Sequence, residues 1–585
     1  MNTLIDLVRG VTWRLFLCAG LGFAATAALA DNPNSIIFSK HNLSFSGPGV
    51  VHATAETDVC IFCHTPHGAS ANEGPLWNHQ MSAATYKFYK SATLKAKDVG
   101  QPNGSSRLCL SCHDGTVALG LVRSRPGGIV MNNAMPTGLN NVGTDLSGDH
   151  PVSFTYDAAL AAAKGGLRDP NTLPPEVALD RNGQLQCTSC HDPHNDQYGN
   201  FLVKDNTGSA LCISCHMMSA WAASSHAVSS QLLPVALASQ LPSKPAGVQS
   251  KAAPPADSVA HTACASCHVP HAAGARDNLM RFSAPEKNCI DCHAGDGPGK
   301  NVAAELKKLS VHPISMDQSS HNSREDLVNP PTRHVTCADC HNPHATSSAP
   351  GGKNQVSGAL AAVSGVSAGG GILSAVTQEY ELCFRCHGDS AARGPARVSR
   401  QVPQTNTRLE FSPGSISFHP VESVGKNSSV PSLIPPLTSS SRIGCSDCHN
   451  SDQNSAAGGS GANGPHGSAY SPLLERRLRL TDGTPYNPSD FALCYKCHSS
   501  SVVNSEQSSS WRYHRKHIEE YKAACTTCHD SHAATQPHLI NFNTVYVQPN
   551  NGVLNYTSAG PNHGTCTLTC HDGSGQNKPH AAKSY

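Results

Sequence analysis

The chain has 585 residues, a formal net charge of +1, 38% hydrophobic residues and only 5% aromatic residues. This composition is poor material for large side-chain cores. Because it contains no basic run and no patch of interleaved aromatics, it also argues against nucleic-acid binding. Two residue types are in excess, 25 cysteines and 33 histidines, and any interpretation has to account for them.

The N-terminal segment predicts a cleaved secretory signal. Arg9 and Arg14 precede an apolar run, and Ala28-Leu29-Ala30 offers a small-residue cleavage site. A membrane anchor is the alternative, but the run is too short and too rich in Ala and Gly for a spanning helix. Lipid attachment at Cys18 is a second alternative, which the bulky residues before it disfavour. We expect export to the periplasm, the outer surface or the extracellular medium, with no transmembrane segment in the mature chain.

Apart from Cys18, every cysteine belongs to one kind of motif, which we number 1 to 12 in chain order. Motifs 1 to 11 read C-x-x-C-H, and motif 12 reads C-x-x-x-C-H. Their cysteines are Cys60 and Cys63, Cys109 and Cys112, Cys187 and Cys190, Cys212 and Cys215, Cys264 and Cys267, Cys289 and Cys292, Cys337 and Cys340, Cys383 and Cys386, Cys445 and Cys448, Cys494 and Cys497, Cys525 and Cys528, and Cys566 and Cys570. Their histidines are His64, His113, His191, His216, His268, His293, His341, His387, His449, His498, His529 and His571.

The spacing of these motifs is that of covalent haem attachment. Two thiols add to the two vinyl groups of one haem, and the adjacent histidine is placed under the porphyrin, where it binds iron. Disulfides need no histidine at that position, and zinc sites space their histidines to complete a tetrahedron. The motifs therefore predict haem c, twelve per chain. For motif 12 an unmodified disulfide between Cys566 and Cys570 stays open as an alternative.

The histidines outside the motifs supply candidates for the sixth iron ligand. In one class the motif continues with x-P-H, or keeps that spacing without Pro. Such a histidine lies too close to its own motif to reach the far face of the same haem, but it can reach a neighbouring one. In a second class His precedes Pro-Val or Pro-Ile, and the proline fixes the direction of the backbone. The first class holds His67, His194, His271, His344 and His532, and the second holds His150, His312 and His419.

The x-P-H motifs alternate with motifs preceded by Leu, so the twelve motifs form six pairs. Motif 9 lacks its x-P-H, but after an insertion over 451–464 the chain resumes with Pro465-His466. We predict that His466 is the displaced ligand; the alternative is a solvated loop histidine. The remaining candidate distal ligands are His226, His517 and His563, whereas no pattern singles out His41, His79, His321, His514, His538 and His580.

On these motifs and x-P-H pairs the chain resembles the bacterial multihaem c-type cytochromes with doubled C-x-x-C-H motifs. They are typified by periplasmic and outer-surface cytochromes of metal-reducing bacteria. The resemblance covers essentially the whole mature chain and implies an electron carrier or conduit with bis-histidine haems. Motif 12 and the insertion before His466 depart from the family pattern.

The expected fold is that of a multihaem cytochrome, in which stacked haems form the core. The rest should be mostly coil with short α-helices at the motifs and very little β structure, because large apolar porphyrins can replace a side-chain core. Short helices are also expected over 473–480 and 514–525. The expected segments are a signal over 1–30 and haem pairs over 31–180, 181–258, 259–330, 331–441, 442–510 and 511–585.

The expected function is electron transfer through the haems, as a carrier or conduit in anaerobic or extracellular respiration, without enzyme activity. A multihaem reductase or oxidase acting on a small nitrogen or sulfur compound is the alternative. No motif ends in Lys and histidines exceed the demand for ligands, so an open iron is disfavoured. A subunit of a polymeric haem filament also stays open. Partners would be other redox proteins or an extracellular or periplasmic acceptor, basic or metal-bearing because haem propionates make the molecule acidic.

Overall fold

A computed structural model describes residues 33–70, 74–138, 140–239, 257–295, 297, 299–314, 326–328, 334–390, 396–560, 563–571 and 576–584. The predicted signal and His321 lie outside these residues. The chain divides into two compact units, one of Met1–Met217, Leu241–Ala256 and His261–Arg281, the other of Met218–Gln240, Asp257–Ala260 and Phe282–Tyr585. The first unit therefore holds motifs 1 to 5, and the second holds motifs 6 to 12.

The first unit is largely coil around a few short elements: α2 (Gly104–His113), α3 (Ala158–Lys164), β1 (Phe154–Thr155) and β2 (Gln184–Leu185). The strands β1 and β2 pair antiparallel, and Phe154 and Leu185 from them pack with Tyr156. Helix α3 begins where the Asp157 carboxylate accepts the Leu160 N–H, a standard N-cap bond. It ends at Gly165, whose φ of 60° few other residues adopt.

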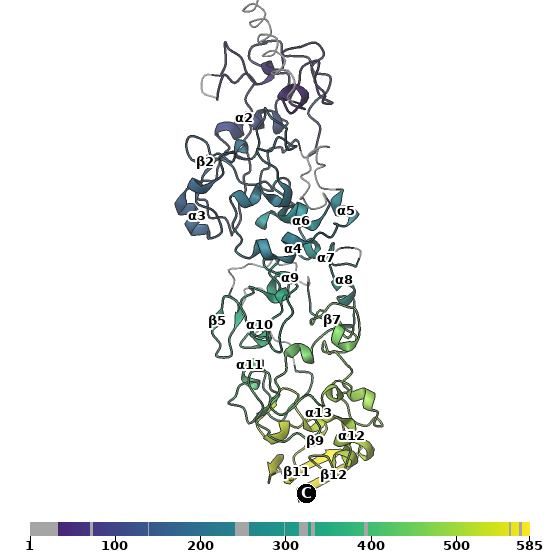
Figure 1. Cartoon of the computed structure of the whole chain (residues 1–585). Helices are drawn as coiled ribbons and strands as arrows, with labels where there is room; N and C mark the ends of the chain where they lie inside the picture. The colour runs from purple at the N-terminus through teal and green to yellow at the C-terminus, as the bar shows by residue number, and fades with distance from the viewer. Residues whose placement is uncertain are drawn as a thin grey trace, which may run out of the picture. The chain divides into compact units, whose positions relative to one another are not determined.

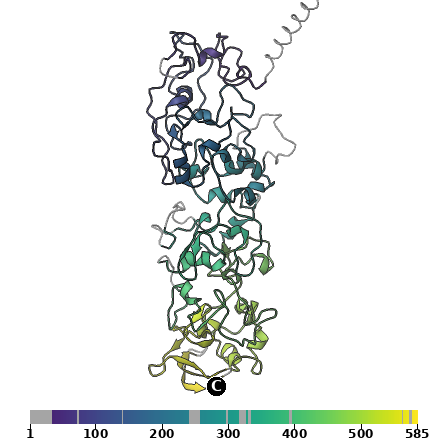
Figure 2. The ribbon, with the colours of Figure 1, turned by 60° about the vertical axis from the view of Figure 1, so that its left-hand side comes forward.

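The second unit has longer coil and more short elements, arranged in chain order from teal through green to yellow (Figure 1, Figure 2). Its helices are α4 (Ser225–Val228), α5 (Val235–Ala238), α7 (Lys287–Ile290), α8 (Val302–Glu305), α9 (Cys337–Cys340), α10 (Glu379–His387), α11 (Thr407–Glu410), α12 (Ser500–Val503) and α13 (Cys525–Cys528), and α6 (Val259–Thr262) spans the division between the units. Its strands are β3 (Ser310–Val311), β4 (Gly365–Val366), β5 (Ile372–Leu373), β6 (Ser417–Phe418), β7 (Gly467–Ser468), β8 (Ala533–Ala534), β9 (Val547–Gln548), β10 (Asn555–Ser558), β11 (Gly564–His571) and β12 (Asn577–Ser584).

These strands form small antiparallel sheets. Three are two-stranded, β3–β7, β4–β5 and β6–β8, and a C-terminal sheet orders β10-β11-β12 with β9 also pairing β11. Side-chain cores are correspondingly small: among the described residues, the cluster with the most buried members joins Val366, Tyr380, Phe384, Phe411 and Val421. The prediction of mostly coil with short helices is confirmed.

Helix α10 shows how the packing of a longer helix positions a motif. Its capping box joins Gln378 and Glu381, and the Glu381 carboxylate accepts backbone N–H bonds from the residues before it. Tyr380 and Phe384, four residues apart, present one buried apolar stripe with ring centroids 5.2 Å apart. The same helix then ends on the motif histidine, so the packing of the stripe fixes where the motif lies.

The expected helix over 473–480 is wrong. Leu474 is buried and makes an antiparallel bridge with His449, while the Glu475 N–H donates to the Cys448 carbonyl. The Glu475 carboxylate is buried as well and accepts a 2.9 Å bond from Lys496. These tertiary contacts hold the segment in an extended conformation, although its sequence pattern favours a helix. Over 514–525 a π-helical turn, Lys516–Glu520, precedes α13.

Candidate haem-binding sites

Eleven of the twelve motifs fold as a single helical turn. The turn is closed by the motif histidine, whose N–H donates to the carbonyl of the first cysteine, as at His64, His191 and His449, at 2.8 to 3.0 Å. One turn brings the two cysteines to the same side of the chain, as the two thioether bonds to one haem would require. The turns lie on η2 (Cys60–Phe62), α2, η4 (Cys187–Ser189), η6 (Cys212–Ser214), η8 (Ala263–Ser266), α7, α9, α10, η11 (Cys445–Asp447), η14 (Cys494–Lys496) and α13.

Motif 12 departs from this geometry because it lies on strand β11. Cys566 pairs with Tyr556 on one side and Lys583 on the other, and Cys570 pairs with Lys578. A strand rises about 3.3 Å per residue, so the two Cα atoms lie well beyond the reach of a disulfide, about 7 Å. The turn that would fit one haem is absent there too, so the expected helix is wrong for this motif. The side chain of His571 lies outside the described part of the structure.

Eight motif histidines face a second histidine ring at a nearly constant distance. Two imidazoles on one metal would have centroids roughly 6 Å apart, since a metal–nitrogen bond is about 2 Å and the centroid lies about 1 Å behind the nitrogen. The centroid distances are 6.2 Å for His64–His194, 6.0 Å for His113–His41, 6.3 Å for His191–His271, 6.3 Å for His216–His150, 5.9 Å for His341–His466, 6.4 Å for His387–His312, 6.2 Å for His449–His532 and 6.2 Å for His529–His514. We call these the ring pairs.

The motif histidines are oriented by hydrogen bonds from Nδ1. The Nδ1 atoms of His64, His191 and His529 lie 2.8 to 2.9 Å from backbone carbonyl oxygens. A carbonyl only accepts, so Nδ1 carries the proton and Nε2 keeps the lone pair that a metal needs. Burial lowers the pKa of His449 and His529 to about 4, which keeps both rings neutral at pH 7. The residues present therefore fit bis-histidine haem.

For five of the six odd-numbered motifs, the carbonyl that orients the motif histidine belongs to a recurring turn that sequence reasoning missed; the exception is His341, which contacts the Ala359 carbonyl. A residue at positive φ follows the acceptor, and the next residue forms an antiparallel bridge with the motif histidine. Such strained backbone is kept where the surrounding structure requires it. The sequence signal is Asn, Pro or His followed by two large apolar residues, 9 to 23 positions after the motif histidine. The turns are Pro75-Leu76-Trp77, Asn200-Phe201-Leu202, Asn278-Leu279-Met280, Pro472-Leu473-Leu474 and His538-Leu539-Ile540.

In most ring pairs the second ring is delivered by backbone ladders between distant segments. In β3–β7, Val311 pairs with Gly467, and the His312 N–H donates to the His466 carbonyl. In β6–β8 the same arrangement joins His419 to His532, at 3.0 Å. The first unit repeats this arrangement twice. The His150 N–H donates to the Pro270 carbonyl at 2.8 Å, and the Ile36 N–H donates to the His194 carbonyl at 3.1 Å. One ladder thus presents histidines to both motifs of an earlier pair.

Two of the delivered histidines bind a carboxylate instead of a carbonyl. His271 Nδ1 lies 3.0 Å from Asp149 Oδ1, and His532 Nδ1 lies 3.1 Å from Glu410 Oε2. Burial alone would lower the pKa of His532, but the hydrogen bond to Glu410 raises the pKa above its ordinary value. Both carboxylates are buried.

The structure places most of the predicted distal ligands against a motif histidine or another ring. His150, His194, His271, His312, His466 and His532 stand in ring pairs, and His226 and His419 are the histidines with the largest electrostatic influence on His293 and His498. His67 is exposed, and in the described part of the chain no motif histidine faces it. His344 lies against Trp221 at 6.1 Å, His517 faces His580 at 6.3 Å, and the role of His563 stays a prediction. The pattern search missed His41 and His514, because neither precedes Pro nor follows a motif.

Contacts between thiols order the motifs within each unit. The first cysteine of an even-numbered motif lies beside the first cysteine of the next motif, and within a pair the second cysteines lie close enough to influence each other electrostatically. The first contacts are Cys109–Cys187, Cys212–Cys264, Cys289–Cys337, Cys383–Cys445 and Cys494–Cys525; the second are Cys63–Cys112, Cys190–Cys215, Cys340–Cys386, Cys448–Cys497 and Cys528–Cys570. Motifs 1 to 5 and motifs 6 to 12 therefore follow one another in chain order.

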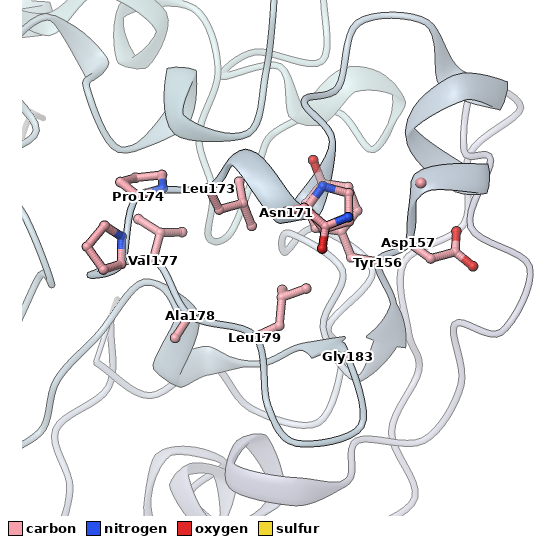
Figure 3. Close-up of a pocket in the computed structure, with 12 residues that line it drawn as sticks. Tyr156, Asp157, Asn171, Leu173, Pro174, Val177, Ala178, Leu179 and Gly183 are labelled. Carbon is pink, nitrogen blue, oxygen red and sulfur yellow. The ribbon is translucent and has the colours of Figure 1, made fainter.

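A pocket of about 490 Å³ lies away from this chemistry, in the first unit. Leu173, Pro174, Val177 and Leu179 line it, and Asp157 lies at its edge, where it caps α3 (Figure 3). Its lining contains no motif cysteine or histidine. Within the described residues, we also find no helix of the length and hydropathy needed to cross a bilayer.

Comparisons with known proteins agree with these sites. A family model of the doubled CXXCH motif matches residues 181–220, which hold motifs 3 and 4. The chain is similar to the multihaem cytochrome MtrA of Shewanella baltica (strain OS185), with 26% identity over 176 residues. That stretch covers 28% of this chain and 36% of the relative, so the match spans about a third of the relative's length.

The motif turns, the ring pairs and these matches define a protein that binds haem c. The doubled CXXCH family model at motifs 3 and 4 and the similarity to MtrA support a multihaem c-type cytochrome like those of metal-reducing bacteria. The resemblance seen in the sequence is thereby confirmed.

Proposed function

We propose that the chain is an electron conduit in which each of its twelve motifs binds one haem c and two histidines ligate each iron. The observation that carries this proposal is the set of ring pairs, eight motif histidines each about 6 Å from a second imidazole. When bound, haem supplies one-electron chemistry at iron. Two strong nitrogen ligands leave no position for a substrate, which favours electron transfer over catalysis.

The thiol contacts support an order for the transfer. Since each thiol would carry one edge of a haem, cysteines in contact bring neighbouring haem edges together. Electrons would then pass along the chain order, through motifs 1 to 5 in one unit and 6 to 12 in the other. Within each unit, motifs that are neighbours in the sequence are also neighbours in the series of thiol contacts.

The setting we propose is respiration outside the cytoplasm, anaerobic or extracellular, with other redox proteins or an external acceptor as partners. The secretory signal predicted over 1–30 and the similarity to a multihaem cytochrome support it. The haem propionates make a basic partner surface or a metal-bearing acceptor the best electrostatic match. A filament built from this chain stays an alternative for its assembly.

Haem stoichiometry tests the proposal directly. The intact mass after acid denaturation should exceed the mature polypeptide by twelve haem masses, and a Cys60→Ala/Cys63→Ala variant should lose one of them. Eleven haem masses in the parent protein would mean that motif 12, on its strand, is not loaded. Fewer than ten would refute the conduit.

Ligation is tested by electron paramagnetic resonance of the oxidised protein. Six-coordinate bis-histidine iron is low-spin, so the spectrum should contain low-spin ferric signals alone. A high-spin signal equivalent to one iron per chain would show an open site and favour a reductase instead.

A further inference from the structure

Two of the histidines in ring pairs differ from the rest in what their Nδ1 atoms contact. Most Nδ1 atoms contact a neutral backbone carbonyl or a hydroxyl, as His341 does with Ala359 and His514 with Ser509. His271 and His532 instead contact the carboxylates of Asp149 and Glu410, at 3.0 and 3.1 Å.

Both carboxylates are built into the protein and are not surface groups that happen to lie nearby. Asp149 is 7% exposed and Glu410 is 9% exposed. Asp149 also accepts a bond from the Ala272 N–H, on the same turn as His271. The cationic side chain near Glu410 is Arg400, but Arg400 already forms an ion pair with the Asp530 carboxylate, at 3.2 Å. The negative charge of each carboxylate therefore acts mainly on the histidine that it contacts.

A carboxylate at Nδ1 changes what the imidazole can give to a metal at Nε2. The proton shared with the carboxylate leaves more electron density on the ring, which makes the ring a stronger donor. A buried negative charge also acts through a lower effective dielectric than one in water. Both effects favour ferric over ferrous iron, because the ferric form carries one more positive charge.

We propose that Asp149 and Glu410 are positioning residues that act through His271 and His532 and hold the reduction potentials of the haem sites of motifs 3 and 9 below those of their neighbours. The inference rests on the proposed function, since it needs haem at those motifs with His191–His271 and His449–His532 as ligands. It adds a property that the ligand set alone does not give.

The placement of the two sites gives this property a consequence. In the first unit motif 3 lies between motifs 2 and 4, through Cys109–Cys187 and Cys190–Cys215. In the second unit motif 9 lies between motifs 8 and 10, through Cys383–Cys445 and Cys448–Cys497. Each unit thus has one interior site that is reduced last, and a partly reduced protein keeps ferric iron in the middle of each series.

The chain supplies a matched control at motif 1. His194 Nδ1 lies 3.4 Å from Asp192 Oδ1, but the two side chains are 63% and 45% exposed. Water and salt screen a charge in that position. Asp192 should therefore leave the potential of the site of His64–His194 unchanged, although it is also a carboxylate beside a ring-pair histidine.

The experiment uses the holoprotein with Asp149→Asn, Glu410→Gln, their double variant and Asp192→Asn. The amides keep the shape and one acceptor oxygen but remove the charge. In a spectroelectrochemical titration, each of the first two variants should raise the reduction potential of one low-potential centre. The ferric–ferrous equilibrium of that centre should change about tenfold, which corresponds to about 59 mV for one electron. The double variant should shift two centres, Asp192→Asn none, and Glu410→Asp, which keeps the charge, should retain the parent potential.

Paramagnetic resonance separates this inference from the proposed function. All variants should stay low-spin, with changed g-values for one centre in each amide variant. Unchanged potentials in low-spin Asp149→Asn and Glu410→Gln would overturn the inference and leave the conduit intact. A high-spin centre in either variant would also overturn it, since the carboxylate would then hold the ring in place without tuning it. Fewer than ten haems, or high-spin iron equivalent to one centre per chain, in the parent protein would refute the proposed function itself.

Discussion

At the scale of single residues, the ring pairs separate histidines that look alike in the sequence. His67 follows motif 1 in the x-P-H pattern but is exposed, whereas His41 has no patterned context and lies 6.0 Å from the ring of His113. His41 is oriented by a 3.2 Å contact between its Nδ1 and the Pro193 carbonyl. His194, His271, His466 and His532 each face the histidine of the odd-numbered motif two places earlier, so this pattern gives His67, which follows motif 1, no motif histidine to face.

His41→Ala should therefore convert one low-spin centre to high-spin and raise its potential, because a strong nitrogen donor is lost. All haems should remain attached, since the thioethers do not depend on the sixth ligand. Electron paramagnetic resonance and intact mass measure the two effects. His67→Ala is the matched control and should reproduce the parent spectrum. A spin change in His67→Ala with none in His41→Ala would reverse the assignment.

The same scale shows what the sequence could and could not predict. The motif cysteines and histidines could be singled out because covalent attachment of haem would require their fixed spacing. His466, whose ring lies 5.9 Å from that of His341, could be singled out because Pro465 precedes it after the insertion, and its role as a ligand stays a prediction. His41 was not, since its acceptor Pro193 lies 152 positions away. Asp149 and Glu410 were hidden for the same reason, as their histidines lie 122 positions later. Contacts at such separation leave no local pattern.

At the scale of elements, two-residue strands do more than their length suggests. The pairing of β3 with β7 presents His312 to His387 and His466 to His341, so one ladder serves motifs 7 and 8. The sequence predicted neither strand, because two residues carry no alternation to detect. The strand β11 shows the opposite failure: motif chemistry favoured a helical turn, but pairing on both sides holds Cys566 and Cys570 extended.

Gly467 in β7 tests the role of that ladder. A Cβ added there would lie 1.8 Å from the Glu305 carbonyl oxygen, which is backbone and cannot move aside as a side chain could. Gly467→Ala should displace His466, give a high-spin fraction at the site of motif 7 and cost about 1–3 kcal/mol of stability. Resonance spectra and thermal unfolding measure these effects. Gly127→Ala, where a Cβ meets nothing within 4 Å, should leave both unchanged. A fully low-spin Gly467→Ala protein would show that the ladder does not set the ligand.

At the scale of the whole chain, ligand delivery links each pair of motifs to the next. The second rings for motifs 1 and 2 lie beside motif 3, those for motifs 3 and 4 beside motif 5, and those for motifs 9 and 10 beside motif 11. Motif 11 breaks the rule, since His529 faces His514 from just before it. For motifs 1 to 4, 9 and 10, complete bis-histidine ligation would therefore need the pair that follows, a dependence that small side-chain cores alone would not create.

Removal of residues 511–585 tests this dependence. The truncated chain loses motifs 11 and 12 and with them His532, the ring opposite His449. It should carry ten haems, and the centre at motif 9 should become high-spin. The centre at motif 10 should stay low-spin with a raised potential, because His419 loses the Ser531 carbonyl that accepts from its Nδ1. Motifs 7 and 8, whose partners His466 and His312 remain, should be unaffected. The full-length variant His532→Ala should reproduce the spin change at motif 9 with twelve haems attached. Ten low-spin centres in the truncated protein would show that each pair completes its own ligation.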